Sequence, residues 1–345
     1  MKKGLSILLM FISGLWLSGC IEEFRLPTEA IDPIVVIEGM ITDGVVYIEV
    51  SQTSNSNLIS QPVTGATIRI YNQEGEFFFL GESEEGHYEL EPDALDVSPG
   101  KAFYMEAILP DGTIYRSRPD TVPTATAADE LSWTKGKDRG RNVIQVWTNP
   151  AIPEVVGGTR SMWRITDSYV QTPTNFPDPF NALPPNCYVE YQPDLQRIAL
   201  LDGGKLAGKT AGRLLLGSVF IDASFDEKHV ISAEQYSLSP QAYGYWERAA
   251  RLLAQNGSLF DPPPAILPGN IYRVAGEEEP TRGFVAVGLY QVGRFAIYPS
   301  DLPTLTFLDP CEYKPDVLFY PSGCTRCLDL PNSSYQIPEY FDSIR

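Results

Sequence analysis

Four cysteines in the second half of the chain are the residues whose type and spacing most directly suggest chemistry. Cys324 and Cys327 form a C-x-x-C pair, whereas Cys187 and Cys311 stand apart from it and from each other. A C-x-x-C pair can serve as one knuckle of a zinc site or as a redox pair. However, there is no second such pair, and no helix-forming pattern follows Cys324. We therefore favour disulfides, with three possible connectivities, over a four-cysteine zinc site.

The first twenty residues have the order of elements that marks an exported protein. Lys2 and Lys3 precede an apolar run from Leu5 to Leu17, and Leu17-Ser18-Gly19-Cys20 closes this run. The run has the length of a signal-peptide core and is short for a transmembrane span. Its end resembles the bacterial lipobox, where a peptidase cleaves and leaves a diacylglycerol thioether on the cysteine. We predict a lipoprotein signal peptide over residues 1–19 and lipidation of Cys20.

Residues 20–33 then read as a tether. Glu22 and Glu23 follow the lipidated cysteine directly, which resembles the acidic signal that sends lipoproteins of Bacteroidota to the outer leaflet of the outer membrane. We expect a protein anchored in the outer membrane and facing the cell exterior. No other run approaches ~18 consecutive apolar residues, so the lipid on Cys20 is the expected contact with the bilayer.

Composition and charge exclude several classes of function. The 345 residues include 26 Lys and Arg against 44 Asp and Glu, a formal charge of -18, and 43% are hydrophobic. A chain of this length and hydrophobicity can form about two globular units. So acidic a protein repels phosphate backbones and anionic headgroups, so we expect no binding to nucleic acid and no electrostatic docking to a membrane.

The remaining motifs give little support to catalysis. Gly203 to Thr210 matches the phosphate-binding pattern G-x-x-x-x-G-K-(S/T), but a helix is not expected behind it and an exported protein meets no nucleotide pool. The two histidines, His87 and His229, have no metal or catalytic spacing and are interpreted as surface residues. Glu277 to Glu279 lacks the pattern of a calcium loop. We predict no catalytic residue, metal or cofactor, although a pair among the 44 acids could lie at the separation used by glycosidases.

The segment from residue 34 to about 119 predicts short strands. Six runs rich in β-branched and aromatic residues alternate with Asp-Gly and Glu-Gly turn signals. The runs are Ile34–Glu38, Val45–Val50, Ala66–Tyr71, Glu76–Leu80, Phe103–Ile108 and Thr113–Ser117. The pattern predicts an antiparallel β-sandwich over residues 34–122.

Residues 120–128 read as a linker, and residues 123–345 as a second β-rich domain. Ser239-Pro240 predicts the start of one prominent helix, near residues 239–256, with a stripe formed by Tyr243, Trp246, Ala250 and Leu253. A strand pair over residues 283–289 and 294–298 and a cysteine-containing tail follow. The four mature tryptophans, Trp133, Trp147, Trp163 and Trp246, are interpreted as core residues.

Two Pro-rich loops, residues 173–185 and 260–270, are the better candidates for interaction with a partner, because such segments become ordered at low entropic cost. They carry Phe176 and Phe180 in the first loop, and Phe260, Asp261 and Asn270 in the second. For the second loop we favour slightly the alternative, a structural role in packing the end of the helix.

Several segments together resemble one family. They include Val35-Val-Ile-Glu-Gly39 near the mature start, Pro62-Val-Thr-Gly-Ala-Thr-Ile68, Ser237-Leu-Ser-Pro240, the block from Gly257 to Asn270, and the closing C-x-x-C. Their order is similar to that of the domain-of-unknown-function family 4249 of outer-membrane lipoproteins in Bacteroidota. The tail after Cys327 departs from the family pattern. The resemblance implies an immunoglobulin-like, carboxypeptidase regulatory-like N-terminal sandwich and a gene beside a TonB-dependent receptor; it assigns no catalytic residue.

We therefore expect a non-enzymatic accessory lipoprotein that binds a TonB-dependent transporter in nutrient uptake. Two alternatives stay open. One is a surface glycan hydrolase that uses paired carboxylates, and the other is a structural or assembly protein of the outer membrane with a broad exposed apolar patch.

Overall fold

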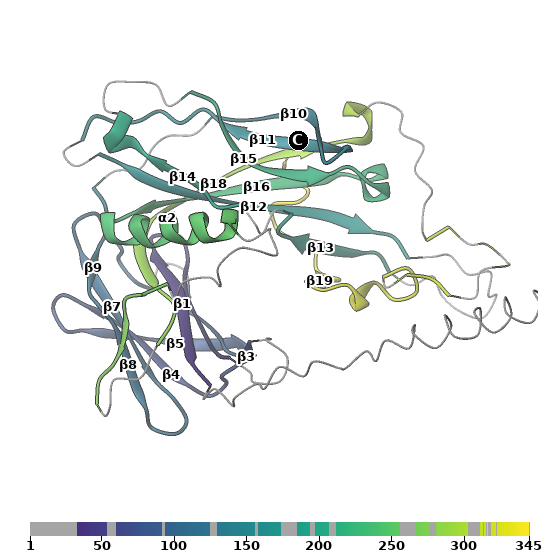
Figure 1. Ribbon diagram of the computed structural model, residues 1–345. Helices are drawn as coiled ribbons and strands as arrows, with labels where there is room; N and C mark the ends of the chain where they lie inside the picture. Colours follow the sequence, from purple (N-terminus) through teal and green to yellow (C-terminus); the bar gives the residue numbers. More distant parts are fainter. Residues whose placement is uncertain are drawn as a thin grey trace, which may run out of the picture.

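The computed structural model describes residues 33–53, 60–91, 94–124, 130–155, 158–173, 185–193, 197–206, 212–255, 267–275, 281–302, 311–312, 314, 316, 319–321 and 323–344. These residues are mainly β, with one α-helix, and form a large mixed sheet and a small one (Figure 1). The first half contains β1 (Val35–Thr42), β2 (Val46–Gln52), β3 (Gln61–Pro62), β4 (Thr67–Asn72), β5 (Phe77–Glu84), β6 (His87–Glu89), β7 (Ala102–Ile108), β8 (Ile114–Ser117), β9 (Asp120–Thr121), β10 (Leu131–Asp138), β11 (Arg141–Thr148) and β12 (Arg160–Gln171). The second half contains β13 (Cys187–Tyr191), β14 (Ala199–Asp202), β15 (Leu214–Phe220), β16 (His229–Leu238), α2 (Pro240–Gln255), β17 (Ile271–Arg273), β18 (Val285–Ile297) and β19 (Ser333–Ser334).

Local sequence accounts for the N-terminal strands. In β4 the side chains of Ile68 and Ile70 are buried, while Arg69 between them lies on the other face, as the alternation predicts. Gly75 and Gly112 stand in the turns after β4 and β7 with φ of 86° and 84°, in the left-handed region that favours glycine. The predicted mainly β architecture is confirmed here.

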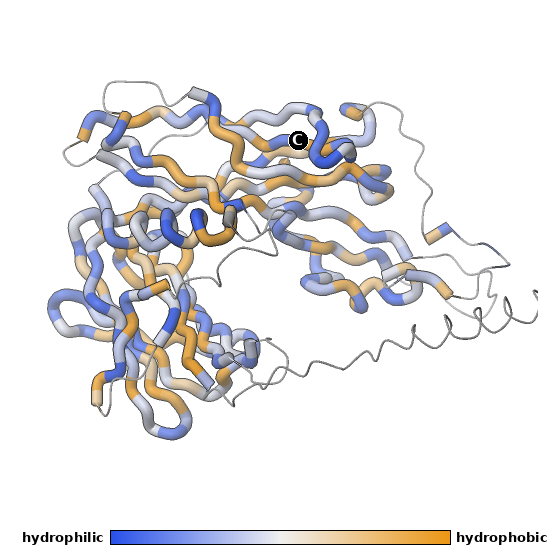
Figure 2. The backbone as a smooth tube through the Cα atoms, viewed as in Figure 1, coloured by the Kyte–Doolittle hydropathy of each residue, from blue (hydrophilic) through white to orange (hydrophobic). Residues whose placement is uncertain are grey.

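Two sheet portions enclose the core of the N-terminal half. Strand β5 belongs to both, because Phe77–Leu80 pair with β4 and Gly81–Glu84 pair with β6. One portion contains β6, β2 and β1, and the other contains β5, β4, β7 and β8. Ile37 and Ile48 from the first portion pack with Ile70 and Phe103 from the second in one buried cluster. Figure 2 shows hydrophobic stretches running along these strands.

The C-terminal half of the chain completes this sheet. Strand β18 pairs with β1 in parallel, with Gly39 opposite Val285, and β17 pairs with β8. Ile271, Val285 and Val287 belong to the same buried cluster as the N-terminal residues. The predicted boundary near residue 122 stays a prediction, and the strands on its two sides share one sheet.

A second core lies between the large sheet and the three-stranded sheet β10-β11-β15. Trp163 and Ile231 from the large sheet pack with Ile144 and Val219 from the small one. Trp163 is fully buried, Trp133 packs against the same cluster, and Trp246 packs against a third cluster beneath α2.

Helix α2 begins where the sequence predicts. The Oγ atom of Ser239 accepts a hydrogen bond from the backbone N–H of Ala242 and donates one to Asp120 Oδ2 at 2.7 Å. The first half of the helix packs Ala242, Tyr243 and Tyr245 against the sheet, whereas Leu253 near its end is exposed. Within the described residues no helix is long and apolar enough to span a membrane.

The predicted strand pair at residues 283–298 is wrong, because β18 is one continuous strand of 13 residues. Its glycines permit close packing rather than a turn. A Cβ atom at Gly288 would lie 2.1 Å from the carbonyl oxygen of Ser237, and one at Gly293 would lie 2.4 Å from Leu131 Cδ1. The sequence patterns also missed the longer strands β10, β13 and β16 and the short strands β3, β6, β9, β17 and β19.

Candidate ligand-binding cleft

A cleft of about 780 Å³ opens on the outer face of β1 and β2, beside the turn between β5 and β6. The alternation that sends Ile37 and Ile48 into the core sends their neighbours Glu38 and Glu49 into the cleft. The acidic side chains that line it are Glu38, Glu49, Glu84, Glu85 and Glu89. Carboxylates accept hydrogen bonds, so the cleft suits ligands that carry O–H or N–H donors. Within the described residues no group of acids, cysteines and histidines is arranged to hold a metal ion.

Glu38 and Glu49 lie directly opposite each other on neighbouring strands. Side chains in such positions have Cβ atoms about 4.5–5.5 Å apart. Burial raises the pKa of Glu38, and the nearby charge of Glu49 raises it further, against the opposing effects of Arg164 and of the hydrogen bond from Tyr245. The side chain of Glu49 is exposed. The two carboxyl groups therefore differ in their surroundings, although they are neighbours.

His87 lies between two of the acids at the edge of the cleft. Its Nε2 atom is 2.8 Å from Glu89 Oε1, and its Nδ1 atom is 3.4 Å from Glu49 Oε1. The imidazole also stacks on the ring of Tyr47, with centroids 5.6 Å apart. His87 is partly exposed, in line with its interpretation as a surface residue, and it holds the acids of β2 and β6 in place.

A partly buried guanidinium, that of Arg164, acts electrostatically on Glu38 of the cleft. Arg164 Nη1 donates a hydrogen bond to Tyr47 Oη at 2.8 Å, and the guanidinium lies 5.5 Å from the ring of Trp246. Glu234, opposite Arg164 in the sheet, accepts hydrogen bonds from the hydroxyls of Tyr236 and Tyr290. Sequence reasoning missed this group. The only available signal was the position of Arg164 between Trp163 and Ile165, because strand alternation places it on the face opposite to both.

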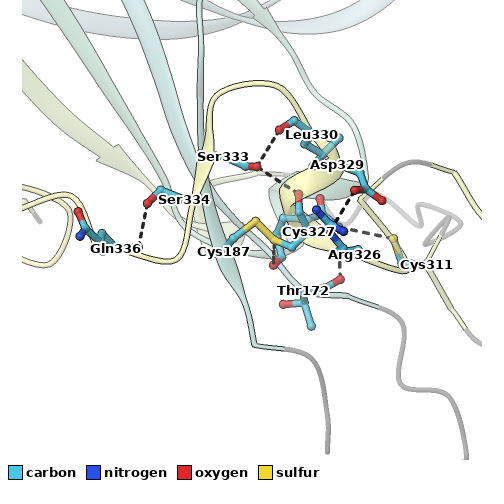
Figure 3. Close-up of a disulfide and its surroundings, with 11 residues drawn as sticks. Thr172, Cys187, Cys311, Arg326, Cys327, Asp329, Leu330, Ser333, Ser334 and Gln336 are labelled. Carbon is cyan, nitrogen blue, oxygen red and sulfur yellow. Dashed lines mark hydrogen bonds and ion pairs between the residues drawn. A yellow bond between two sulfur atoms is a disulfide. The ribbon is translucent and has the colours of Figure 1, made fainter. Parts of the chain in front are cut away.

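Cys187, Cys311, Cys324 and Cys327 do not line this cleft and form two disulfides, Cys187–Cys327 and Cys311–Cys324. The two members of the C-x-x-C pair therefore have different partners, which selects one of the three predicted connectivities and contradicts the zinc alternative. Figure 3 shows Cys187, on β13, bonded to Cys327 beside the turn in which Ser333 Oγ donates to Leu330 O at 2.7 Å. The Cys187–Cys327 disulfide fastens the tail to β13 of the large sheet, and Cys311–Cys324 links two positions within the tail.

Asn270 is buried rather than presented in a loop. Its Nδ2 atom donates to the carbonyl oxygen of Val285 at 2.8 Å, and its Oδ1 atom accepts from the amide of the same residue. This side chain ties the start of β17 to β18, so it is not accessible for the predicted interaction role. Cys20, Phe176, Phe180, Phe260, Asp261 and the run Glu277–Glu279 lie outside the described residues.

The interpretation of His229 as a surface residue is wrong. Its side chain is fully buried, and its Nδ1 atom lies 2.9 Å from Oδ1 of the equally buried Asp167. The imidazole stacks between Phe225, at 3.7 Å, and Tyr169, at 5.0 Å. Gly203–Leu206, the start of the phosphate-loop pattern, forms a short 3-10 helix, and residues 207–210 lie outside the described part of the chain.

The fold and the cleft define a mainly β protein that carries a carboxylate-lined cleft on its N-terminal strands. Residues 21–294 match the family described as Domain of unknown function (DUF4249), and the chain belongs to this family. The resemblance found from sequence segments is confirmed at that level. No match was found among curated proteins.

Solved structures give only distant likenesses. Trypsin-activated alpha-2-macroglobulin from Escherichia coli is 11% identical, with a TM-score of 0.21, over 61% of this chain and 15% of its own. A Salmonella alpha-2-macroglobulin mutant is 10% identical, with a TM-score of 0.20, over 81% of this chain and 16% of its own. The chicken interferon gamma receptor alpha chain is 9% identical, with a TM-score of 0.20, over 60% and 91% of the two chains. We draw no argument from these scores.

Proposed function

We propose that this chain is a lipoprotein, anchored through Cys20 at the outer surface of the outer membrane, which binds a nutrient and assists a TonB-dependent transporter without catalysis. The observation that carries the proposal is the acidic cleft, in which His87 contacts Glu49 and Glu89. A binding site needs polar groups that converge and are held in place before the ligand arrives. The predicted signal sequence and the family resemblance support the proposed location and partner.

We further propose that residues 34–122 form an immunoglobulin-like sandwich of the carboxypeptidase regulatory-like kind. The support is the single core lined from both sheet portions and the passage of β5 from one portion to the other.

Purification of the full lipoprotein from native outer membranes in a gentle detergent tests the partner. We expect a stoichiometric TonB-dependent β-barrel to accompany it. A lipoprotein that purifies alone would contradict the accessory role.

Ligand binding is tested separately with the Glu49→Gln variant, which removes one charge from the cleft and keeps the size of the side chain. We expect weaker binding of the nutrient that the partner transporter imports, measured by calorimetry. Glu74→Gln, on an exposed turn outside the cleft, is the matched control. Equal affinity in both variants would show that the ligand binds elsewhere.

A second candidate function is hydrolysis of a surface glycan, and the Glu38–Glu49 pair favours it. Retaining glycosidases use two neighbouring carboxyl groups, one as the acid and the other as the nucleophile, and the strand register makes Glu38 and Glu49 neighbours. Glu38, with its raised pKa, would be the acid, and the exposed Glu49 the nucleophile. A panel of aryl glycosides tests this candidate: hydrolysis abolished by Glu38→Gln and by Glu49→Gln supports it, and no hydrolysis of any glycoside contradicts it.

A further inference from the structure

The outer face of the second sheet portion carries an unusual row of side chains across five strands, β5, β4, β7, β8 and β17, at the bottom left of Figure 1. The strand register places Phe79 opposite Arg69, Arg69 opposite Glu106, Glu106 opposite Arg116, and Arg116 opposite Tyr272. The row therefore reads aromatic, arginine, glutamate, arginine, aromatic. We call it, with the adjacent Phe77, Tyr71 and Tyr104, the aromatic–arginine face.

The central carboxylate of this face is fully engaged. Glu106 is 4% exposed, and its two oxygens bond to Arg69 Nη1 at 3.2 Å and to Arg116 Nη2 and Nε at 2.7 and 2.8 Å. Tyr71 donates a further hydrogen bond to it. The side chains of Arg69 and Arg116 remain 28% and 37% exposed, and a guanidinium has five N–H donors. The row thus presents a net positive charge on a chain whose formal charge is -18.

The two ends of the row are exposed apolar groups. Phe77, Phe79 and Tyr272 are 47%, 56% and 43% exposed, and they are three of the ten large hydrophobic side chains exposed in the described part of the chain. The guanidinium of Arg69 lies 5.3 and 5.2 Å from the rings of Phe77 and Phe79. Aromatic residues and arginine are the types enriched at the energetic centres of protein interfaces.

The ring geometry favours a protein over a sugar as the occupant. Tyr71 and Tyr104 stack on each other at 4.9 Å with an interplanar angle of 3°, so each covers one ring face of the other. Phe77 and Phe79 meet edge to face at 87°. No flat series of rings is presented for stacking with sugars. The partly exposed guanidiniums instead complement a carboxylate that is flanked by apolar side chains.

We propose that the aromatic–arginine face is the surface on which this protein docks to its membrane partner, through a partner loop that carries Asp or Glu among apolar residues. This inference rests on the proposed function, because it takes the β-barrel transporter as the occupant. It separates the docking surface from the acidic cleft, which is left free for the ligand.

Site-specific photo-crosslinking of the full lipoprotein in native outer membranes tests the proposal. A photoreactive phenylalanine analogue replaces Phe79 in one variant, and Phe319, which is 89% exposed in the tail, in the control. We expect the β-barrel transporter, identified by mass spectrometry, in the crosslink from position 79 and not from position 319. A crosslink from position 79 to a second copy of this chain would overturn the proposal. So would a barrel captured from position 319 alone, although the accessory function would then stand. If the barrel is absent from every crosslink and from the purification in gentle detergent, both the docking surface and the accessory function are contradicted.

A pair of variants measures the contribution of the face. Phe79→Ser with Tyr272→Ser removes the two ends of the row and leaves the Arg69–Glu106–Arg116 group intact, so folding should be preserved. We expect the amount of copurified barrel to fall by about ten-fold or more, because interface aromatic residues commonly contribute that much. Phe319→Ser with Tyr335→Ser removes one exposed Phe and one exposed Tyr from the tail and should change nothing. Equal recovery of barrel with both double variants would overturn the proposal.

Discussion

The two outer faces of the N-terminal half differ in how their charged side chains are arranged. On the β1–β2 face, the two acids Glu38 and Glu49 lie directly opposite each other, which is an unfavourable arrangement of like charges. On the β4–β7–β8 face, Glu106 lies between Arg69 and Arg116, so neighbouring charges alternate in sign. Both faces cover the same buried core.

This difference indicates that the β4–β7–β8 face is arranged for stability, whereas the β1–β2 face is arranged, as we propose, to bind a ligand. The alternating row satisfies its own buried carboxylate, and its aromatic ends and the exposed parts of its two guanidiniums remain available to a partner. The acidic pair is held together against its own repulsion, and a ligand that donates hydrogen bonds would relieve that repulsion. Like-charge pairs of this kind are typical of functional sites rather than of stabilising ones.

The largest expected effect is on the free energy of unfolding. It tests the contrast by replacing one glutamate on each face, Glu106 and Glu49. We expect Glu106→Ala to lower the free energy of unfolding by about 3 kcal/mol, because it leaves two partly buried guanidiniums without their carboxylate. Glu49→Ala, its counterpart on the other face, should leave stability unchanged or raise it slightly. Urea unfolding at neutral pH measures both. A loss of similar size in both variants would remove the distinction between the faces.

Sequence patterns predicted the fold well where alternation and turns are local. Six strands of residues 34–117, the start of α2 at Ser239-Pro240, and the family were available from short stretches of residues, whereas β3 and β6 were not. The patterns failed where contact with a strand distant in sequence determines the local structure. Gly288 was interpreted as part of a strand end, but it is required by the close approach of β16, 50 or more residues earlier in the chain.

The candidate cleft was harder to predict than the fold. Forty-four acids offer no means of choosing Glu38 and Glu49, because only the register between β1 and β2 brings them together. The same holds for His229, which follows two charged residues in sequence but is buried by its contacts with Asp167 and Phe225. The connectivity of the cysteines likewise depends on where the tail lies against β13.

A smaller effect follows from the raised pKa of Glu38. The folded protein keeps a proton on this carboxyl up to a higher pH than the unfolded chain does. The free energy of unfolding therefore falls as the pH rises from the unfolded-state pKa through the folded-state pKa. We expect Glu38→Gln to raise the free energy of unfolding at pH 7. Loss of the like-charge contact with Glu49 contributes about 0.2–1 kcal/mol of this increase. The gain should disappear at a pH well below 4.5, where the carboxyl is protonated in both states. Urea unfolding over this pH range measures it, and a gain that persists in acid would exclude the charge as its cause.

The smallest effect on stability is expected at the edge of the aromatic–arginine face. Phe79 is 56% exposed, so replacing it by Ser removes little buried area and should change the free energy of unfolding by less than about 0.5 kcal/mol. Its contact with Arg69 is exposed and contributes at the weak end of cation–π interactions. Thermal unfolding of the Phe79→Ser variant measures this, with Phe103→Ser in the core as the destabilising reference. A large loss at Phe79 would mean that the ring stabilises the sheet itself, and its exposure would then no longer indicate a surface kept for a partner.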